Sequence, residues 1–233
     1  VSAEWMIPKA LWLKRHEPEV YAAAATICEY QDFLTLRLTG ERCASLDNAG
    51  LRWHYSSRNG GWAHGILRAL DMDDLVEKWP DRMVAPGEVV GTLTLAAAHA
   101  LGLNPSVKVV QGGADALIGM IGLGVSQPGQ LALITGSSHL LFGVTRAPLH
   151  ARGVWGAYPD IVYPNRWIVE GGQTSTGSII NWLRRFCGGT LDLDEMNRKA
   201  TELAPGSDGL IVQDHFQGNR TPYTDPLSRG AIV

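Results

Sequence analysis

The sequence predicts an α/β fold, because short apolar strands and helical segments alternate through its second half. A β-branched run at 107–111 leads through two glycines into a segment with helical spacing at 116–123. Two further apolar runs, 130–135 and 140–145, flank a short turn and are expected to pair as a hairpin. With 45% hydrophobic residues in a chain of 233, a packed core is expected.

The first part of the chain is expected to be mainly helical. From residue 5 to about residue 40, apolar residues recur at intervals of three and four, which predicts two or three helices. Residues 48–61 are rich in polar turn formers and are expected to form a loop. Short helices are predicted at 71–78 and at 95–101, the second of them ending at Gly102.

Beyond the hairpin, strands and helices continue to alternate. We expect a strand at 167–170, helices at 177–186 and 195–203, and a last strand at 210–212. Periodicity fails near 148–156, between two blocks that contain strands, and this predicts a domain boundary there.

Composition and charge exclude several classes of function. A formal net charge of −3, with Lys and Arg scattered along the chain, gives no basic stripe for nucleic acid. Cys28, Cys43 and Cys187 are odd in number and far apart, and the seven His residues do not pair with Cys, Asp or Glu at ligand spacing. Neither a disulfide framework nor a zinc site is therefore indicated. No stretch approaches ~20 consecutive apolar residues, so a soluble cytoplasmic protein is expected.

Asp115 is the strongest candidate for a catalytic residue. It follows Gly112 and Gly113 at the end of a predicted strand and stands at the start of a predicted helix. The glycines allow close approach to the backbone, and a carboxylate at this end of a strand points into the crevice where α/β proteins bind ligands. Asp is also a common helix cap, so the local pattern leaves capping and acid–base chemistry equally open.

Two glycine-containing segments are candidates for phosphate binding. The turn Gly136-Ser137-Ser138 offers backbone N–H groups and hydroxyls to an anion, although an ordinary hairpin turn is the commoner use of such residues. The segment Glu170-Gly171-Gly172, followed by Ser175 at a helix start, suits a phosphate or a sugar, and equally a strand end with an N-cap.

The loop at 216–226 is dense in residues with special backbone needs, among them Asn219, Arg220 and Pro222. Long polar loops often carry function. An Asn-Arg pair near a Pro is also a normal way to satisfy loop carbonyls, and we favour this structural role.

Together these segments resemble the FGGY carbohydrate kinases over nearly the whole chain. The resemblance rests on seven matches in the family's order: Lys9-Ala10-Leu11-Trp12-Leu13; Asp32-Phe33-Leu34 with Leu38-Thr39-Gly40 ahead of Leu46-Asp47-Asn48-Ala49; Pro86-Gly87-Glu88-Val89-Val90-Gly91; Gly112-Gly113-Ala114-Asp115; Pro128-Gly129-Gln130 with Gly136-Ser137-Ser138; Glu170-Gly171 to Trp182; and Asn219-Arg220-Thr221-Pro222-Tyr223 to Arg229-Gly230. Seven ordered matches are a specific signal.

The resemblance implies an actin-like ATPase fold of the ribonuclease H-like type. Residues 1–150 would be the C-terminal part of the sugar-binding N-terminal domain, which carries the catalytic base, and residues 151–233 the beginning of the nucleotide-binding C-terminal domain. It makes Asp115 the general base and places Glu4 and Asp115 at the sugar. The implied cofactors are ATP and Mg²⁺, with the ion bridging the phosphates. The implied phosphate or ATP contacts are Gly136, Ser137, Ser138, Gly171, Gly172 and Ser175.

The sequence departs from the family pattern in several places. The family's Asp-x-Gly-Thr motif near its N-terminus and its glycine-rich adenosine segment near its C-terminus are absent, and Ser137 replaces the commoner Thr. The sequence also begins without Met and ends in an apolar run, 230–233, that resembles the entry to a strand. We therefore expect a central piece of a longer kinase that is inactive by itself.

The segments Glu4-Trp5-Met6 and Asn219-Arg220-Thr221-Pro222 are most similar to pentulose kinases of the ribulokinase and xylulokinase group. The expected reaction is ATP-dependent phosphorylation of a sugar hydroxyl, with ribulose or xylulose as the sugar. A kinase for another polyol, such as glycerol or erythritol, stays open, as does a noncatalytic sugar-binding or regulatory piece of a degenerate kinase. The expected partner is a small sugar, with neither nucleic acid nor membrane, and a homodimer stays open.

Overall fold

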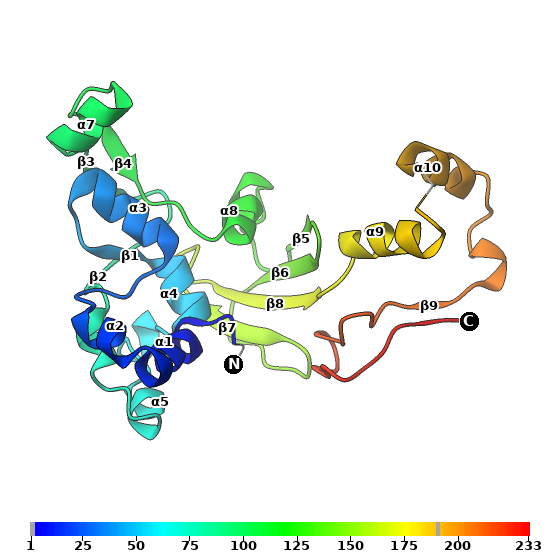
Figure 1. Ribbon diagram of the computed structural model, residues 1–233, viewed down its shortest axis with the longest axis horizontal. Helices are drawn as coiled ribbons and strands as arrows, with labels where there is room; N and C mark the ends of the chain where they lie inside the picture. Colours follow the sequence, from blue (N-terminus) through cyan, green and yellow to red (C-terminus); the bar gives the residue numbers. More distant parts are fainter. Residues whose placement is uncertain (1–2, 190–191) are drawn as a thin grey trace. The chain divides into compact units, whose positions relative to one another are not determined.

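The computed structural model describes residues 3–189 and 192–233, which form two compact units. The first unit holds the chain up to Pro128 together with Val144–Pro148 and Ala157–Ile168. The second unit holds Gly129–Gly143, Leu149–Gly156 and Val169–Val233. Helices and strands occur in both units (Figure 1), so the predicted α/β class is confirmed.

Short helices make up most of the first unit. They are α1 (Met6–His16), α2 (Pro18–Ala23), α3 (Tyr30–Thr39), α4 (Leu46–Arg52), α5 (His64–Ala69), α6 (Leu75–Lys78), α7 (Leu95–Leu101) and α8 (Asp115–Gly122), with a 3-10 turn, η1 (Ser57–Asn59). The strands are β1 (Cys43–Ser45), β2 (Arg82–Val84), β3 (Val89–Thr92) and β4 (Lys108–Val110). Strand β1 pairs with β2 in parallel, whereas β3 and β4 are antiparallel with a register shift between Val89 and Gly91.

Tryptophan side chains lie at the centre of the core of the first unit. Trp53 and Trp79 are buried and stack with their ring centroids 5.5 Å apart. Helix α1 contributes Met6 and Ile7 to the same buried cluster. The indole Nε1 of Trp53 donates a hydrogen bond to Glu29 Oε1 at 3.0 Å, so the polar atom of this buried ring has a partner. Because Trp53 directly follows α4, this core holds that helix in place.

Helix α7 begins and ends at the residues that the sequence signals predict. The hydroxyl of Thr94 accepts a hydrogen bond from the Ala97 N–H at 3.1 Å, which satisfies one of the unpaired donors of the first turn. Gly102 ends the helix with φ of +66°, a left-handed conformation that glycine adopts without a steric penalty.

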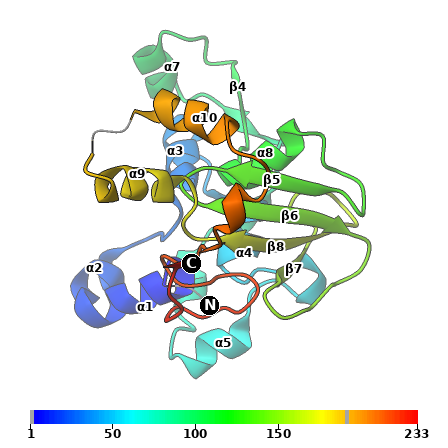
Figure 2. The same cartoon turned by 90° about the vertical axis from the view of Figure 1, so that its right-hand side faces the viewer.

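A four-stranded sheet has the strand order β5-β6-β8-β7 (Figure 2). Its strands are β5 (Leu131–Thr135), β6 (His139–Thr145), β7 (Trp155–Pro159) and β8 (Trp167–Gln173). Strands β5 and β6 are antiparallel with Thr135 opposite His139. The predicted hairpin is therefore confirmed, with residues 136–138 in its turn.

The second unit continues with α9 (Gly177–Phe186), α10 (Leu193–Thr201), the 3-10 turn η2 (Ser207–Gly209), β9 (Val212–Gln213) and β10 (Ala231–Ile232). Strands β9 and β10 pair antiparallel. Neither α9 nor α10 contains a buried residue. The indole of Trp182 on α9 nevertheless packs against Phe216, with ring centroids 4.9 Å apart.

Two sequence predictions of secondary structure were wrong in part. Helix α4 occupies the beginning of the stretch 48–61 that was expected to be loop. Its residues from Asp47 to Leu51 are buried, and tertiary packing outweighs their weak helix propensity. The helix expected at 71–78 is reduced to α6, because the backbone of Asp71 has φ of +57°, which is incompatible with an α-helix.

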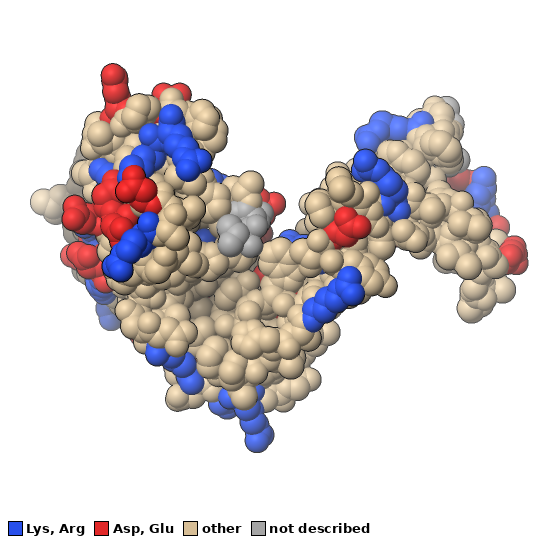
Figure 3. All heavy atoms as spheres, turned by 90° about the horizontal axis from the view of Figure 1, so that it is seen from below, with Lys and Arg blue, Asp and Glu red and all other residues tan. Residues whose placement is uncertain are grey.

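The surface carries charges of both signs. Figure 3 shows both Lys and Arg side chains and Asp and Glu side chains on the face that it presents. Among the described residues, no helix is both long enough and apolar enough to cross a bilayer.

Candidate active site

The segment that leads into Asp115 is anchored at its start by backbone hydrogen bonds. After β4 ends at Val110, the N–H of Gln111 donates to the Glu88 carbonyl at 2.8 Å. The Gln111 carbonyl accepts from the N–H of Gly87 at 2.9 Å. Gln111 itself is 2% exposed, so this end of the segment is fixed in the interior. Four residues then separate β4 from α8, and they bring the chain to the surface.

Asp115 is the first residue of α8, and its side chain is exposed. Ala114 occupies the N-cap position, and no side-chain capping bond is made there. Oδ1 of Asp115 accepts a hydrogen bond at 2.8 Å from the N–H of Ala116, the next residue in the chain. An acid in a first helical turn interacts favourably with the helix dipole. Asp115 is therefore not an N-cap, and its carboxylate stays accessible to a ligand.

A second carboxylate, that of Asp47, lies beneath this segment. Asp47 is fully buried on α4, and its Oδ2 accepts a hydrogen bond from the Ala114 N–H at 3.0 Å. Its Oδ1 accepts from the Asn48 N–H at 2.6 Å and from the Ser45 hydroxyl. Burial raises the pKa of Asp47 to about 6, and its three hydrogen bonds oppose the shift.

Gly113 is required for this contact. A Cβ atom at Gly113 would lie 1.8 Å from Oδ2 of Asp47, far inside van der Waals contact. At the neighbouring Gly112 the nearest atom would be Gln31 Nε2, at an ordinary 3.8 Å. Of these two adjacent glycines, only Gly113 owes its identity to a close approach of a side chain.

Asp32 extends the buried network. It is 2% exposed on α3, and its Oδ1 accepts a hydrogen bond from the Ser45 N–H at 2.9 Å. Ser45 therefore joins two buried carboxylates, through its N–H to Asp32 and through its hydroxyl to Asp47. Burial also raises the pKa of Asp32 to about 6.

Glu4, expected at the sugar, lies exposed in the turn before α1. Trp5 follows it as the N-cap residue of α1, and its ring packs edge-on against His54 with centroids 4.9 Å apart. Both Glu4 and Asp115 belong to the first unit. The predicted sugar contact of Glu4 stays a prediction.

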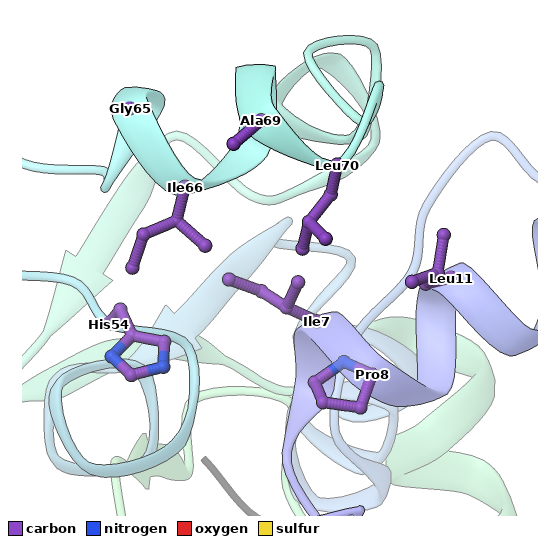
Figure 4. A pocket seen from close by; sticks show the side chains of 8 residues that line it. All are labelled: Ile7, Pro8, Leu11, His54, Gly65, Ile66, Ala69 and Leu70. Carbon is purple, nitrogen blue, oxygen red and sulfur yellow. The ribbon is translucent and has the colours of Figure 1, made fainter.

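A hollow of about 510 Å³ between α1 and α5 is lined almost entirely by apolar side chains. Figure 4 shows Ile7, Ile66 and Leu70 directed into it, with the ring of His54 at one side. Burial lowers the pKa of His54 and so favours its neutral imidazole. A sugar needs several polar partners, and neither Glu4 nor Asp115 lines this hollow. It is therefore a poor candidate for the sugar site.

In the second unit, the turn expected to bind phosphate packs against the start of α9. The N–H of Thr176 donates to the Ser137 carbonyl at 3.0 Å, and the N–H of Gly177 donates to the Gly136 carbonyl at 3.2 Å. A Cβ at Gly177 would lie 2.5 Å from the Gly136 oxygen. The turn and the helix start are thus brought together, while the Ser137 side chain is exposed.

These bonds limit how the helix start can bind an anion. The N–H groups of Thr176 and Gly177 already donate to the turn carbonyls, so they do not offer the usual anion site of a helix N-terminus. Ser175 is 5% exposed, and its hydroxyl is hydrogen-bonded to that of Ser178 at 2.8 Å. Its predicted nucleotide contact is not tested by this geometry and stays a prediction.

Gly171 and Gly172 lie in β8, beside the loop that follows α10. The Gly172 N–H donates to Thr221 Oγ1 at 3.0 Å, and a Cβ at Gly172 would lie 2.5 Å from the His139 oxygen. Thr221 Oγ1 in turn donates to the Gly153 carbonyl at 2.9 Å. Packing therefore explains why glycine is needed at 172, and a contact with nucleotide stays a prediction.

Arg220 anchors the same loop by an ion pair. Its Nη2 lies 2.6 Å from Oε1 of Glu170, whose side chain is 6% exposed. The guanidinium of Arg220 also lies over the ring of Trp155, 5.1 Å from its centroid. These contacts support the structural role that we favoured for residues 216–226.

The side chains that could bind a metal ion are His, Cys, Asp and Glu. Among the described residues, no group of three His, Cys, Asp or Glu side chains could hold a metal ion. Mg²⁺ in kinase sites is usually held by one or two carboxylates together with substrate phosphates and water. A cage made of protein groups alone therefore does not fit the described residues, and a Mg²⁺ ion would be held mainly by the phosphates and by water.

Comparison with protein families decides the identity of the chain. Residues 4–122 match the N-terminal domain of the FGGY family of carbohydrate kinases, and residues 131–233 match its C-terminal domain. The chain belongs to the FGGY family of carbohydrate kinases. The resemblance and the fold class that it implied are confirmed, while the division at residue 150 stays a prediction.

Individual relatives agree with this assignment. An FGGY carbohydrate kinase domain-containing protein of Danio rerio is 32% identical to this FGGY chain, covering all of it and 50% of the relative. Ribulokinase 2 of Staphylococcus saprophyticus is 29% identical, covering all of the chain and 45% of the relative. The crystal structure of xylulose kinase from Rhodospirillum rubrum shares the fold, with a TM-score of 0.80 at 24% identity over 100% of the chain and 46% of that structure. The chain spans about half the length of the curated relatives it matches.

Sequence reasoning did not identify two acidic residues of this FGGY chain as part of the site. Asp47 and Asp32 belong to segments that match the family, but the sequence assigns neither of them a role. Both are buried, and Asp47 contacts the segment before Asp115. A usable signal was present for Asp47. It lies in the largely apolar run 43–51, where a charged residue needs a buried partner.

Proposed function

We propose that this chain is part of an ATP-dependent kinase that phosphorylates a hydroxyl of a ketopentose such as ribulose or xylulose, with Asp115 as the general base. One observation carries the proposal. In a member of a carbohydrate kinase family, an exposed carboxylate stands at the first residue of α8 on a segment fixed from beneath by a buried side chain. A base that is both accessible and positioned is what proton removal from a sugar hydroxyl requires.

In the proposed reaction, the Asp115 carboxylate accepts the proton of the sugar hydroxyl as that oxygen bonds to the γ-phosphorus of ATP. The bond from this phosphorus to the oxygen that bridges it to the β-phosphate breaks, and ADP leaves. ATP would supply the phosphoryl group, and Mg²⁺ would supply positive charge that offsets the charge of the phosphates. Catalysis of this type depends mainly on positioning and electrostatic stabilisation. We assign the sugar to Asp115 and Glu4, and the phosphate to Gly136, Ser137 and Ser138, with Gly171, Gly172 and Ser175 toward the nucleotide.

The choice of a pentulose is supported by several ribulokinases among the relatives, at 27–29% identity. Identity at this level leaves the few side chains that shape a sugar pocket free to differ. The substrate is therefore the finer part of the proposal, and the kinase reaction is the broader part.

A substrate screen tests both parts. The complete protein that contains this sequence is assayed for ADP release with Mg²⁺ and ATP against ribulose, xylulose, glycerol, erythritol and gluconate. We expect the highest kcat/KM with one of the two pentuloses. A preference for a polyol would correct the substrate but keep the kinase, whereas sugar binding by calorimetry without ADP release would favour a noncatalytic sugar-binding protein.

A further inference from the structure

Asp47 lies against the two residues that precede Asp115. Its Oδ2 accepts the Ala114 N–H at 3.0 Å, and Ala114 is the N-cap residue from which α8 starts. The backbone of Gly113 passes so close to the same oxygen that a Cβ there would lie at 1.8 Å. The hydrogen bond at Ala114 and the close steric contact at Gly113 together fix the position and the direction of the backbone just before Asp115.

The second carboxylate oxygen of Asp47, Oδ1, is also fixed by hydrogen bonds. Its Oδ1 accepts from the Asn48 N–H at 2.6 Å and from the Ser45 hydroxyl, so the carboxylate has no freedom to rotate without losing a bond. Ser45 is itself held by Asp32 through its N–H at 2.9 Å. The support beneath Ala114 therefore belongs to β1 and α4, whose residues from Cys43 to Leu51 are almost all buried.

A side chain with two acceptor oxygens is needed to fill this role. Asp47 has three donors, one at Oδ2 and two at Oδ1. An Asn side chain has the same shape but only one acceptor oxygen, so either the Ala114 N–H or the two donors at Oδ1 would face an NH₂ group. Hydrogen bonds to an ionised acceptor are also shorter and stronger than neutral ones. Burying a carboxylate is costly unless it is hydrogen-bonded. Of the three bonds to Asp47, the one from the Ala114 N–H holds the segment before Asp115.

We infer that Asp47 is a positioning residue for Asp115, acting through the Ala114 N–H and the backbone of Gly113. The inference rests on the proposed role of Asp115 as the base. Asp47 itself is fully buried, so we assign it no direct contact with a substrate. Displacement of a catalytic group by about 1 Å can lower a rate on the order of 100-fold, so loss of this support has a measurable effect.

The first test compares two buried aspartates in the complete protein that contains this sequence. Asp47→Asn removes either the acceptor of the Ala114 N–H or the acceptor of the two donors at Oδ1. Asp32→Asn is the matched control, since Asp32 is also buried but accepts its hydrogen bond from the Ser45 N–H and not from residues 113–115. We expect Asp47→Asn to lower kcat and kcat/KM together by about 10- to 100-fold. Asp32→Asn is expected to have a clearly smaller effect at a similar loss of thermal stability. Equal kinetic effects of the two variants would overturn the inference.

A second pair of variants reaches the same contact from the opposite side. Gly113→Ala places a methyl group 1.8 Å from Asp47 Oδ2, while Gly112→Ala meets Gln31 Nε2 at 3.8 Å. Neither glycine has a positive φ, so the substitutions differ mainly in space. Gly113→Ala is expected to lower kcat much more than Gly112→Ala does. This pair decides the question if Asp47→Asn fails to fold, and equal kcat values for the two alanine variants would contradict the inference.

A double-mutant cycle separates this inference from the proposed function. If Asp47 acts through Asp115, adding Asp47→Asn to Asp115→Asn leaves the residual rate unchanged. A further fall by the same factor as in the wild type would show that Asp47 supports the protein in general and would overturn the inference. Near-normal kcat in Asp115→Asn alone would refute the base and, with it, the inference. An inactive Asp115→Asn beside a fully active Asp47→Asn would refute only the role of Asp47.

Discussion

The carboxylate of Asp47 accepts a hydrogen bond from the backbone N–H of Ala114, with 3.0 Å between Oδ2 and N. The two residues are 67 positions apart in the sequence, and the bond joins α4 to the start of α8. It ties a buried acid to the segment that presents an exposed one. Substitutions at the buried acid and at the exposed acid can therefore test stability and activity separately.

We predict that protonation of the buried acids stabilises the fold. The pKa values of Asp32 and Asp47 are about 6 in the folded chain, because burial disfavours their charged forms. Their pKa is about 4 in an unfolded chain, so the folded state binds more protons between pH 4 and 6. The contribution of these acids is greatest below about pH 4 and is lost as pH rises through 6, by on the order of 2 kcal/mol each.

The measurement is the difference in melting temperature between the wild type and Asp32→Asn at several pH values. Other acids have their pKa shifted in the opposite direction, such as Asp160, whose pKa is lowered by Arg58. Subtracting the melting temperature of the variant from that of the wild type removes the contribution of these other acids. The wild type should gain stability relative to the variant as pH falls from 7.5 to about 4.5. A relative loss over this range would show that Asp32 is stabilised in its charged form.

A second prediction concerns the contact between the hairpin turn and α9. Gly177→Ala should lower the free energy of unfolding by roughly 1–3 kcal/mol, because the new Cβ would lie 2.5 Å from the Gly136 oxygen. Gly122→Ala at the end of α8 is the control, since its Cβ meets no atom within 4 Å and alanine is the better helix former. Denaturant unfolding should give opposite signs for the two variants, and two equal effects would argue against the packed turn.

A third prediction concerns the ion pair between Arg220 and Glu170. Arg220→Met should destabilise the protein by about 3 kcal/mol, because it takes a cationic partner from a carboxylate that is 6% exposed. Arg198→Met on α10 also removes ion pairs, with Glu195 and Glu202, but all three side chains there are well exposed. This control should change the stability by less than about 1 kcal/mol. If chemical denaturation gives the same small value for both, the loop is not anchored by this pair.

Ser137 makes a fourth prediction, on activity. Ser137→Ala removes one exposed hydroxyl from the proposed phosphate turn but leaves its backbone as it is. We expect a loss of kcat/KM for ATP of less than about tenfold, smaller than the loss caused by removing the base. Steady-state kinetics of the complete protein measures it. No change at all would remove the Ser137 hydroxyl from the phosphate site, and a loss as large as that of Asp115→Asn would give Ser137 a role that we have not assigned.

Local signals in the sequence were enough to predict several elements. Gly102 ends α7 as predicted, and helix α9 spans the predicted residues 177–186. The hairpin was predicted because its two apolar strands flank a short turn of small residues. In these elements, propensity, capping and packing favour the same structure.

What the sequence could not supply was the set of long-range contacts. Helix α4 was missed because its residues are weak helix formers that become helical through burial. The identity of Gly113 as the close-contact glycine, and of Asp47 as its neighbour, depends on a distance between residues 66 positions apart. Likewise, the donors at the start of α9 looked suitable for phosphate, but the Gly136 and Ser137 carbonyls accept them. Hydrogen-bond partners of this kind are fixed by the tertiary fold.

The most direct test of the central claim is the kcat of Asp115→Asn in the complete protein, measured by coupled ADP release with the preferred sugar and compared with sugar affinity by calorimetry. An amide cannot accept the hydroxyl proton, so kcat should fall by about 10²–10⁴-fold while the sugar still binds and the fold is kept. A variant that retains near-normal kcat would contradict the assignment of Asp115 as the general base.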